Sequence, residues 1–117
     1  MAESLKFGTS GLRGLASELE GQAARRYVAA FLRHAQAIGQ EGRGQVFIGR
    51  DFRPSSASIL RDCAAAIRSV GLEPVDCGTI STPALAAYAM ERGGPAVMIT
   101  GSHIPADRNG LKFYLPS

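Results

Sequence analysis

Residues 45–56 read QVFIGRDFRPSS, and this stretch decides the fold. Its mostly apolar start, 45–48, predicts a buried strand, and its serines precede a helical pattern over about 56–70. The order then repeats. A short strand over 72–77 leads to a helix that opens at Ser81 or Thr82 and ends at Gly93, and a buried strand follows over 96–100. This alternation predicts a layered α/β domain with a mixed, mostly parallel sheet of four strands.

The flanking segments extend this pattern in both directions. A helix is expected over about 22–38, ended by Gly39, with one apolar stripe made of Ala24, Val28, Phe31, Ala35 and Ile38. Residues 5–14 are expected to form an extended entry and a glycine-rich turn. A polar loop over 101–110 leads to a last strand over 111–115.

The caps and crossovers of the central elements locate a possible ligand site. Ser55 or Ser56 is the expected N-cap of the second helix, and Gly71 its C′ residue. Right-handed crossovers bring the loops at Arg50 and Ser102 to the carboxyl ends of neighbouring strands. Open α/β sheets bind ligands at that edge.

Composition and charge narrow the class of protein. The chain has 117 residues and a mass of 12.3 kDa, with 45% apolar and 20% charged residues, as expected for one compact globular domain. Its net charge is +3, yet basic residues never run longer than two, which favours a small anionic ligand and no nucleic acid. The longest apolar run, 84–90, is too short to span a membrane. The N-terminus lacks the features of a secretory signal, so the expected location is the cytoplasm.

The cysteines and histidines do not suggest a metal site or a disulfide. Cys63 and Cys77 lack paired spacing, and Cys63 falls on the apolar face of a predicted helix, as a reduced core residue would. His34 is expected on the outer side of the first helix. A Ser-His-Asp hydrolase is also disfavoured, because the chain has no G-x-S-x-G elbow.

Three polar segments carry groups that can bind an anion. Residues 100–112 place Ser102 beside His103, with Arg108 and Lys112 nearby, as a phosphate-carrying serine would require. Residues 7–14 alternate glycines with hydroxyls ahead of Arg13, a possible anion-binding nest. Taken one at a time, each segment favours a plainer interpretation: a capped surface loop for 100–112 and a flexible N-terminal turn for 7–14. In 49–56 the favoured interpretation is an Asp51 paired with a neighbouring arginine beside a helix N-terminus.

Taken together, the three segments resemble the signatures of the α-D-phosphohexomutase superfamily, the phosphomannomutase/phosphoglucomutase enzymes. Residues 7–14 resemble its F-G-T-S-G-I-R-G motif, 49–56 its G-R-D-x-R-x-S motif, and 100–112 its phosphoserine loop, T-[AG]-S-H-N-P-x-x-x-N-G-x-K. The three occur in the family's order and with comparable spacing. The chain departs from the pattern at Ile104, where the family usually has Asn, so a polar side chain beside the serine is lost.

The resemblance implies that residues 1–117 correspond to the first α/β domain of a four-domain enzyme. The family's metal-binding loop of type D-G-D-x-D-R and its sugar-recognition and phosphate-binding loops have no counterpart here. The chain alone is therefore expected to be inactive, and to self-associate through surface that would face the missing domains. If the chain is naturally complete, the alternative is a non-catalytic module that binds small anions or another protein.

The resemblance also implies the reaction and the site. A phosphomannomutase is preferred, which interconverts the 1- and 6-phosphates of mannose or glucose through a phosphoserine and a bisphosphate intermediate. Magnesium is the implied cofactor, bound to the phosphate on Ser102 and to ligands in the second domain. The implied partners are a hexose phosphate and the other domains. The implied catalytic residues are Ser102, His103, Lys112 and Arg13, and the implied substrate- or phosphate-binding residues are Thr9, Ser10, Gly101, Arg108 and Asn109.

Overall fold

The structure is a computed structural model that describes residues 4–8, 11–101, 104–105 and 107–116. Strands and helices alternate through most of its length. In chain order the elements are β1 (Lys6–Gly8), β2 (Gly11–Leu15), α1 (Ala16–Leu19), α2 (Gln22–Ala37), β3 (Gln45–Arg50), α3 (Pro54–Ser69), β4 (Glu73–Thr79), α4 (Thr82–Arg92), β5 (Ala96–Ile99) and β6 (Arg108–Tyr114).

The strands form one sheet in the order β1-β2-β6-β5-β3-β4. β3 pairs in parallel with β4 and β5, whereas β6 is antiparallel to β5 and to β2, and β1 is antiparallel to β2. The predicted α/β fold is confirmed. The sheet differs in detail, because within the described residues it has six strands rather than four and is parallel in only one half. The segment expected to be a glycine-rich turn forms the β1–β2 hairpin, and β2 pairs with β6.

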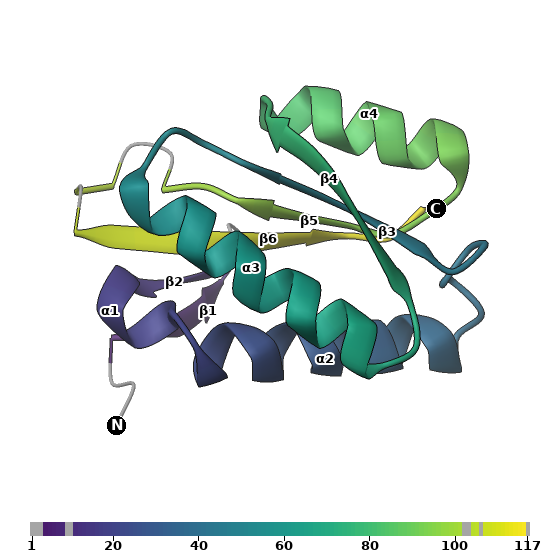
Figure 1. Ribbon diagram of the computed structural model, residues 1–117, viewed down its shortest axis with the longest axis horizontal. Coiled ribbons are helices and arrows are strands. Elements are labelled where there is room, and N and C mark those ends of the chain that lie inside the picture. Colours follow the sequence, from purple (N-terminus) through teal and green to yellow (C-terminus); the bar gives the residue numbers. More distant parts are fainter. Residues whose placement is uncertain (1–3, 9–10, 102–103, 106, 117) are drawn as a thin grey trace.

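Helices cover the sheet on both faces (Figure 1). α2 and α3 lie side by side on one face together with the short α1, and α4 stands apart on the other. The larger core lies under α2 and α3, where Val28 and Ile59 pack against Ile48 and Ile99 of the sheet. The smaller core lies under α4 around Phe47, Leu85 and Met98. None of the helices in the described segments is long and apolar enough to cross a membrane.

The buried stripe of α2 differs from its predicted course at the end of the helix. Ala24, Val28 and Ala35 are buried as predicted, but Leu32 completes the stripe, and Ile38 is 49% exposed. Ile38 is the C-cap, with φ −102° and ψ 11°, so its side chain leaves the helical face. Gly39 follows with φ +71° and ends the helix as predicted.

The starts of α3 and α4 show how local chemistry sets helix boundaries. α4 begins as predicted, with the Ser81 hydroxyl accepting a hydrogen bond from the Ala84 amide. α3 begins two residues earlier than predicted, because Pro54 takes the first helical turn and Arg53 is the N-cap. The expected cap residue Ser56 is instead fully buried and donates its hydroxyl to Asp51.

The cysteines occupy the positions expected of reduced thiols. Cys63 is free and fully buried between α3 and the sheet, and this burial raises the pKa of its thiol well above the ordinary value. Cys77 is also free and partly buried on β4. A thiol held protonated in an apolar core is unreactive, so Cys63 acts as a packing residue.

Candidate functional site

The loop after β3 meets the loop after β5 at the carboxyl ends of these two strands. β3 and β5 are parallel neighbours, and Arg50 pairs with Ile99 where both strands end. One residue further on, the Asp51 amide donates to the Ile99 carbonyl at 2.9 Å. The predicted meeting of the Arg50 loop and the loop that contains Ser102 is therefore confirmed for the described residues on either side.

The Asp51 carboxylate ties the two loops together. Its Oδ2 accepts a hydrogen bond from the Gly101 amide at 2.9 Å, and its Oδ1 accepts from the Arg53 amide at 3.1 Å and the Ser56 hydroxyl at 2.5 Å. Partial burial acts to raise the pKa of Asp51. The hydrogen bonds from Ser56, Gly101 and Arg53 outweigh it, and Thr100 adds a further one, so the pKa lies below its ordinary value.

The Arg53 side chain reaches across from the start of α3 and binds the backbone of the second loop. Its Nη2 donates to the Ile104 carbonyl at 2.6 Å, and its Nη1 donates to the carbonyls of Pro105 at 2.6 Å and Arg108 at 2.9 Å. Its Nε lies 3.4 Å from Asp51 Oδ2, so the predicted pairing of Asp51 with a neighbouring arginine is confirmed for Arg53. We call this pair the Asp51–Arg53 clamp.

Gly101 is where the clamp and the loop come closest. A Cβ atom at this position would lie 2.1 Å from Arg53 Cζ, so the guanidinium rests directly against the glycine backbone. Any larger residue would displace it. The predicted phosphate-binding role of Gly101 stays a prediction, but the close approach gives a structural reason for a residue without a side chain.

Asn109 fastens the far end of the same loop to α3. It is fully buried, and its Nδ2 donates to the hydroxyls of Ser55 at 2.9 Å and Ser56 at 2.8 Å, while its Oδ1 accepts from the Gly110 amide. The implied phosphate-binding role of Asn109 remains a prediction. In this structure its amide group is already engaged in positioning β6 against the helix.

Arg13 and Lys112 lie on the same face of the sheet. Their neighbours Leu12 and Leu111 pair with each other and point into the core under α2 and α3, so both cations point the opposite way. Arg13 pairs with Gly110, and a Cβ at Gly110 would be 3.2 Å from Arg13 Cγ. Both cationic side chains are partly exposed, Lys112 on β6, the strand that leaves the serine loop, and Arg13 on the neighbouring β2.

The remaining predicted residues divide into two groups. Ser102 and His103, the implied phosphoserine and its neighbour, lie outside the described residues, as do Thr9 and Ser10. Arg108 is partly buried at the start of β6, where its carbonyl accepts from Arg53. The described part of the predicted site therefore gathers around the two ends of the loop between β5 and β6.

The structure adds positioning residues that sequence reasoning missed. The sequence predicts only an ion pair for Arg53 and only helix caps at Ser55 and Ser56, yet all three hold the loop between β5 and β6. The signal available was the position of residues 49–56 at the carboxyl end of a strand, next to the serine loop.

The described residues do not by themselves fit a metal ion. Within residues 4–8, 11–101, 104–105 and 107–116, no group of three His, Cys, Asp or Glu side chains is placed to hold one. The carboxylate nearest to the serine loop, Asp51, already accepts hydrogen bonds on both oxygens and faces Arg53. The implied magnesium would need ligands beyond these.

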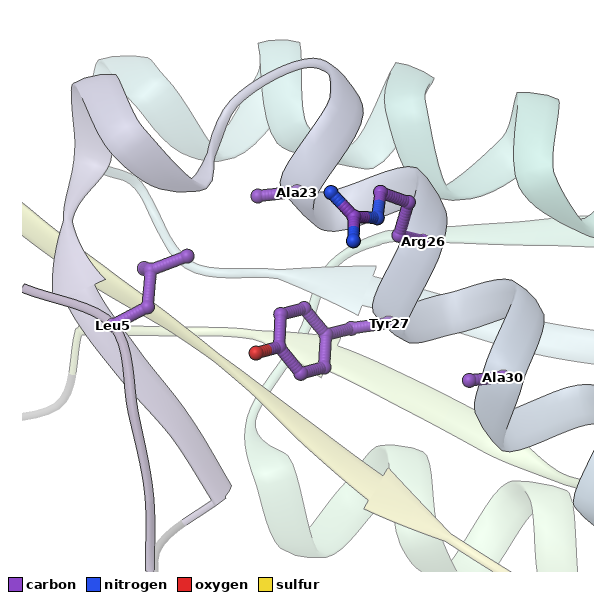
Figure 2. Close-up of a pocket in the computed structure, with 5 residues that line it drawn as sticks. All are labelled: Leu5, Ala23, Arg26, Tyr27 and Ala30. Atoms are coloured by element: carbon purple, nitrogen blue, oxygen red, sulfur yellow. The ribbon is translucent and has the colours of Figure 1, made fainter. Parts of the chain in front are cut away.

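A separate groove lies between Leu5 and the first half of α2 (Figure 2). It has a volume of about 390 Å³ and is lined by Leu5 and by the α2 residues Ala23, Arg26, Tyr27 and Ala30. Among the predicted site residues that the structure describes, none lines this groove.

Known proteins show which family combines this fold with these motifs. Residues 4–117 match the family described as "Phosphoglucomutase/phosphomannomutase, alpha/beta/alpha domain I". A phosphomannomutase from Sinorhizobium fredii is 56% identical over 112 residues, which cover 95% of this chain and 24% of the relative. A phosphoglucosamine mutase from Levilactobacillus brevis is 37% identical over 114 residues, covering 92% of this chain and 25% of the relative.

A solved structure agrees with the sequence relatives. A phosphoglucomutase/phosphomannomutase family protein from Burkholderia thailandensis superimposes with a TM-score of 0.81 at 30% identity, over 94% of this chain and 26% of that one. The chain thus spans about a quarter of the length of the relatives it matches. It belongs to the phosphoglucomutase/phosphomannomutase family, whose α/β/α domain I its residues 4–117 match.

Proposed function

We propose that this chain is the phosphoserine-bearing domain of a phosphohexomutase, with Ser102 as the group that carries the phosphoryl. The observation that supports this most is the Asp51–Arg53 clamp, which fixes the loop on both sides of Ser102 through Gly101 and Ile104. A residue that must give up and recover a phosphoryl group requires a backbone held in place, because small misplacements of reacting atoms cost large factors in rate.

The transfer conserves atoms and charge in each direction. The bond between phosphorus and Ser102 Oγ breaks while a bond forms between phosphorus and a hydroxyl oxygen of the hexose phosphate. The hydroxyl loses its proton and the serine oxygen regains one, and His103 beside the serine is placed in sequence to exchange that proton. The bisphosphate then turns over and returns its other phosphoryl group to Ser102.

Arg13 and Lys112 supply positive charge for this step. They share one face of the sheet, on the neighbouring strands β2 and β6, and phosphoryl transfer depends mainly on positioning and on stabilising the charge of the transferred group. A guanidinium binds two phosphate oxygens at once, whereas an ammonium acts as a compact point charge. We assign Arg13 to holding the phosphate and Lys112 to balancing charge near the serine oxygen.

Magnesium remains part of the proposal as a cofactor of the whole protein. A divalent ion would neutralise charge on the phosphate oxygens of Ser102. Its other ligands are assigned to the second domain, as the resemblance implies, and within the described residues no cluster of three such side chains fits a metal ion.

Mannose phosphates are the preferred substrates. The chain is 56% identical to the Sinorhizobium fredii phosphomannomutase and 37% identical to the Levilactobacillus brevis phosphoglucosamine mutase, both over nearly the whole of its length. The preference is tested by comparing kcat/KM for mannose 1-phosphate, glucose 1-phosphate and glucosamine 1-phosphate in the full-length protein that contains this domain.

Phosphate mapping tests the proposal directly. The full-length protein is incubated with glucose 1,6-bisphosphate, and its phosphorylated peptide is identified by mass spectrometry. We expect one phosphate on Ser102, and a Ser102→Ala variant without phosphate or mutase activity. The matched control is Ser69→Ala, an exposed serine at the end of α3. Phosphate on another residue, with activity kept in Ser102→Ala, would refute the assignment.

The isolated chain gives a second test. We expect the 117-residue chain to show no mutase turnover with magnesium and a hexose bisphosphate, because sugar contacts and metal ligands would lie elsewhere in the protein. Self-association, measured by analytical ultracentrifugation, is expected if surface that normally meets other domains is left exposed. Substantial turnover by the folded chain would place the chemistry within these residues alone.

A further inference from the structure

We propose that Arg53, held by Asp51, is a positioning residue for phosphoryl transfer: its guanidinium sets the backbone of the serine loop without touching the substrate. The inference rests on the proposed function, because it assumes that Ser102 accepts and donates the phosphoryl group. It adds a residue pair from the β3–α3 loop to a site otherwise built from the β5–β6 loop and β2.

The geometry of the contacts calls for a guanidinium. Nη1 and Nη2 donate to the carbonyls of Ile104, Pro105 and Arg108 while Nε faces Asp51, so the planar group is used on several edges at once. The side chain of Arg53 is 17% exposed, and its bonds to Ile104 and Arg108 are partly buried, whereas the bond to Pro105 is exposed. A lysine has the same charge but one nitrogen, and cannot make the same set of bonds.

The clamp acts on the loop and on Arg108, the first residue of β6, and leaves the paired interior of the two strands untouched. The base of the loop is closed by the sheet itself, since β5 and β6 pair and the Thr100 amide donates to the Gly110 carbonyl at 3.0 Å. Arg53 contacts the part beyond this base, at Ile104 and Pro105. Losing the guanidinium should therefore free the loop while the sheet stays intact.

The unusual residue in the loop does not weaken the clamp. Ile104 stands where the family pattern usually has Asn, and it contributes through its backbone, accepting from Arg53 at its carbonyl and donating its amide to the Gly101 carbonyl at 2.9 Å. These bonds do not depend on the side chain. The clamp therefore explains how this loop keeps its conformation with an aliphatic residue at that position.

The test uses the full-length protein with Arg53→Lys and Arg53→Ala, and Arg68→Lys as the control on the exposed side of α3. Each variant is assayed for kcat and KM, for the rate at which glucose 1,6-bisphosphate phosphorylates Ser102, and for its melting temperature. We expect kcat and the phosphorylation rate to fall about 10²-fold in both Arg53 variants, with KM changed less than threefold. Arg68→Lys should match the parent.

Chemical rescue separates positioning from general support of the fold. Methylguanidinium added to Arg53→Ala should restore part of the phosphorylation rate, whereas methylammonium at the same concentration should not, because only the first reproduces the forked donor. If a variant at Arg53 does not fold, Asp51→Asn tests the other half of the clamp with the same readouts.

The outcomes distinguish the two proposals. If the parent protein is not phosphorylated on Ser102, the proposed function fails. If the parent is phosphorylated and Arg53→Lys keeps the parent kcat, the clamp inference is wrong. A fall in melting temperature with unchanged kcat per folded molecule, or equal rescue by both cations, also overturns it.

Discussion

The two halves of the sheet contrast in how they are covered. In the parallel half, β3 and β5 are packed on one face under α3 and on the other under α4, and the β5 side chains are all buried. In the antiparallel half, Leu12 and Leu111 pack under the helices, but the opposite face carries the partly exposed Arg13 and Lys112. Antiparallel sheets tolerate one solvated face, whereas parallel strands are normally buried on both. We therefore expect the parallel half to contribute most to stability. The candidate site lies where parallel pairing gives way to antiparallel pairing, between β5 and β6.

The largest loss of stability is expected in the parallel half. Ile48 of β3 is fully buried in the larger core, so Ile48→Ala should lower the free energy of unfolding by about 2–5 kcal/mol. The control is Ile38→Ala, at a position 49% exposed, which should change it by less than about 0.5 kcal/mol. Urea unfolding of the 117-residue chain measures both. If the two substitutions lowered the free energy of unfolding equally, the buried parallel half would not be the main source of stability.

A smaller loss is expected where the two halves are joined. Asn109→Ala leaves the buried hydroxyl of Ser56 and the partly buried hydroxyl of Ser55 without this partner and should cost about 1–3 kcal/mol. Gln45→Ala, at an exposed polar residue of β3, is the control. A double-mutant cycle with Ser55→Ala should show that the two substitutions are not additive. Additive costs would mean that Asn109 does not couple β6 to α3.

Acid should weaken the clamp in a predictable direction. The pKa of Asp51 is lower in the folded chain than in the unfolded one, so its contribution to stability is fully present above the unfolded pKa. That contribution is lost as pH falls through the folded pKa. The melting temperature is measured between pH 7 and pH 3, a range of about four units chosen to include the ordinary carboxyl pKa. In Asp51→Asn it should fall less steeply with acid than in the parent chain. The exposed Asp107→Asn should follow the parent curve, and a parent-like curve for Asp51→Asn would contradict the assignment.

The smallest effect on stability is expected on the open face of the antiparallel half. Lys112 is partly exposed and points away from the larger core, so Lys112→Met should change the free energy of unfolding by less than about 0.5 kcal/mol. The same variant of the full-length protein should lose most of its mutase activity under the proposed function. A destabilisation above about 1 kcal/mol would show that Lys112 supports the fold, and the separation of the two halves would need revision.

Sequence periodicity predicted the elements that bury a continuous apolar face. The strands that end near Arg50 and just before Gly101 were expected to end side by side, and they do, because parallel strands joined by right-handed crossovers share an edge. The β1–β2 hairpin was not expected. Its glycines carry little strand signal, and its place in the sheet comes from pairing with β6, far away in sequence.

The Asp51–Arg53 clamp could not be predicted from the sequence for a related reason. Pattern reasoning places backbone, and the role of Arg53 depends on how far one side chain extends into a loop some fifty residues away, as its bond to Pro105 shows. The predicted start of α3 was wrong because it, too, depends on side-chain contacts that local sequence does not show. Ser56 is of a residue type that often caps helices, but its hydroxyl donates a hydrogen bond to Asp51, and Pro54 begins the first turn. Side chains committed to tertiary hydrogen bonds are not recognisable from local propensity alone.

The pairing of β2 with β6 fixes the order in which the domain can be completed on the ribosome. Leu12 leaves the exit tunnel early, but its partner Leu111 is added about a hundred residues later. Until then β1 and β2 form at most an isolated hairpin, which is marginal in water, with an apolar side uncovered. Arg13 therefore reaches Gly110 only in the final stage of folding, after β3, β4 and β5 have been made. Nascent chains halted before β6 should hold the parallel strands and helices but lack the cationic side of the site, and their uncovered β5 edge is where a chaperone would be needed.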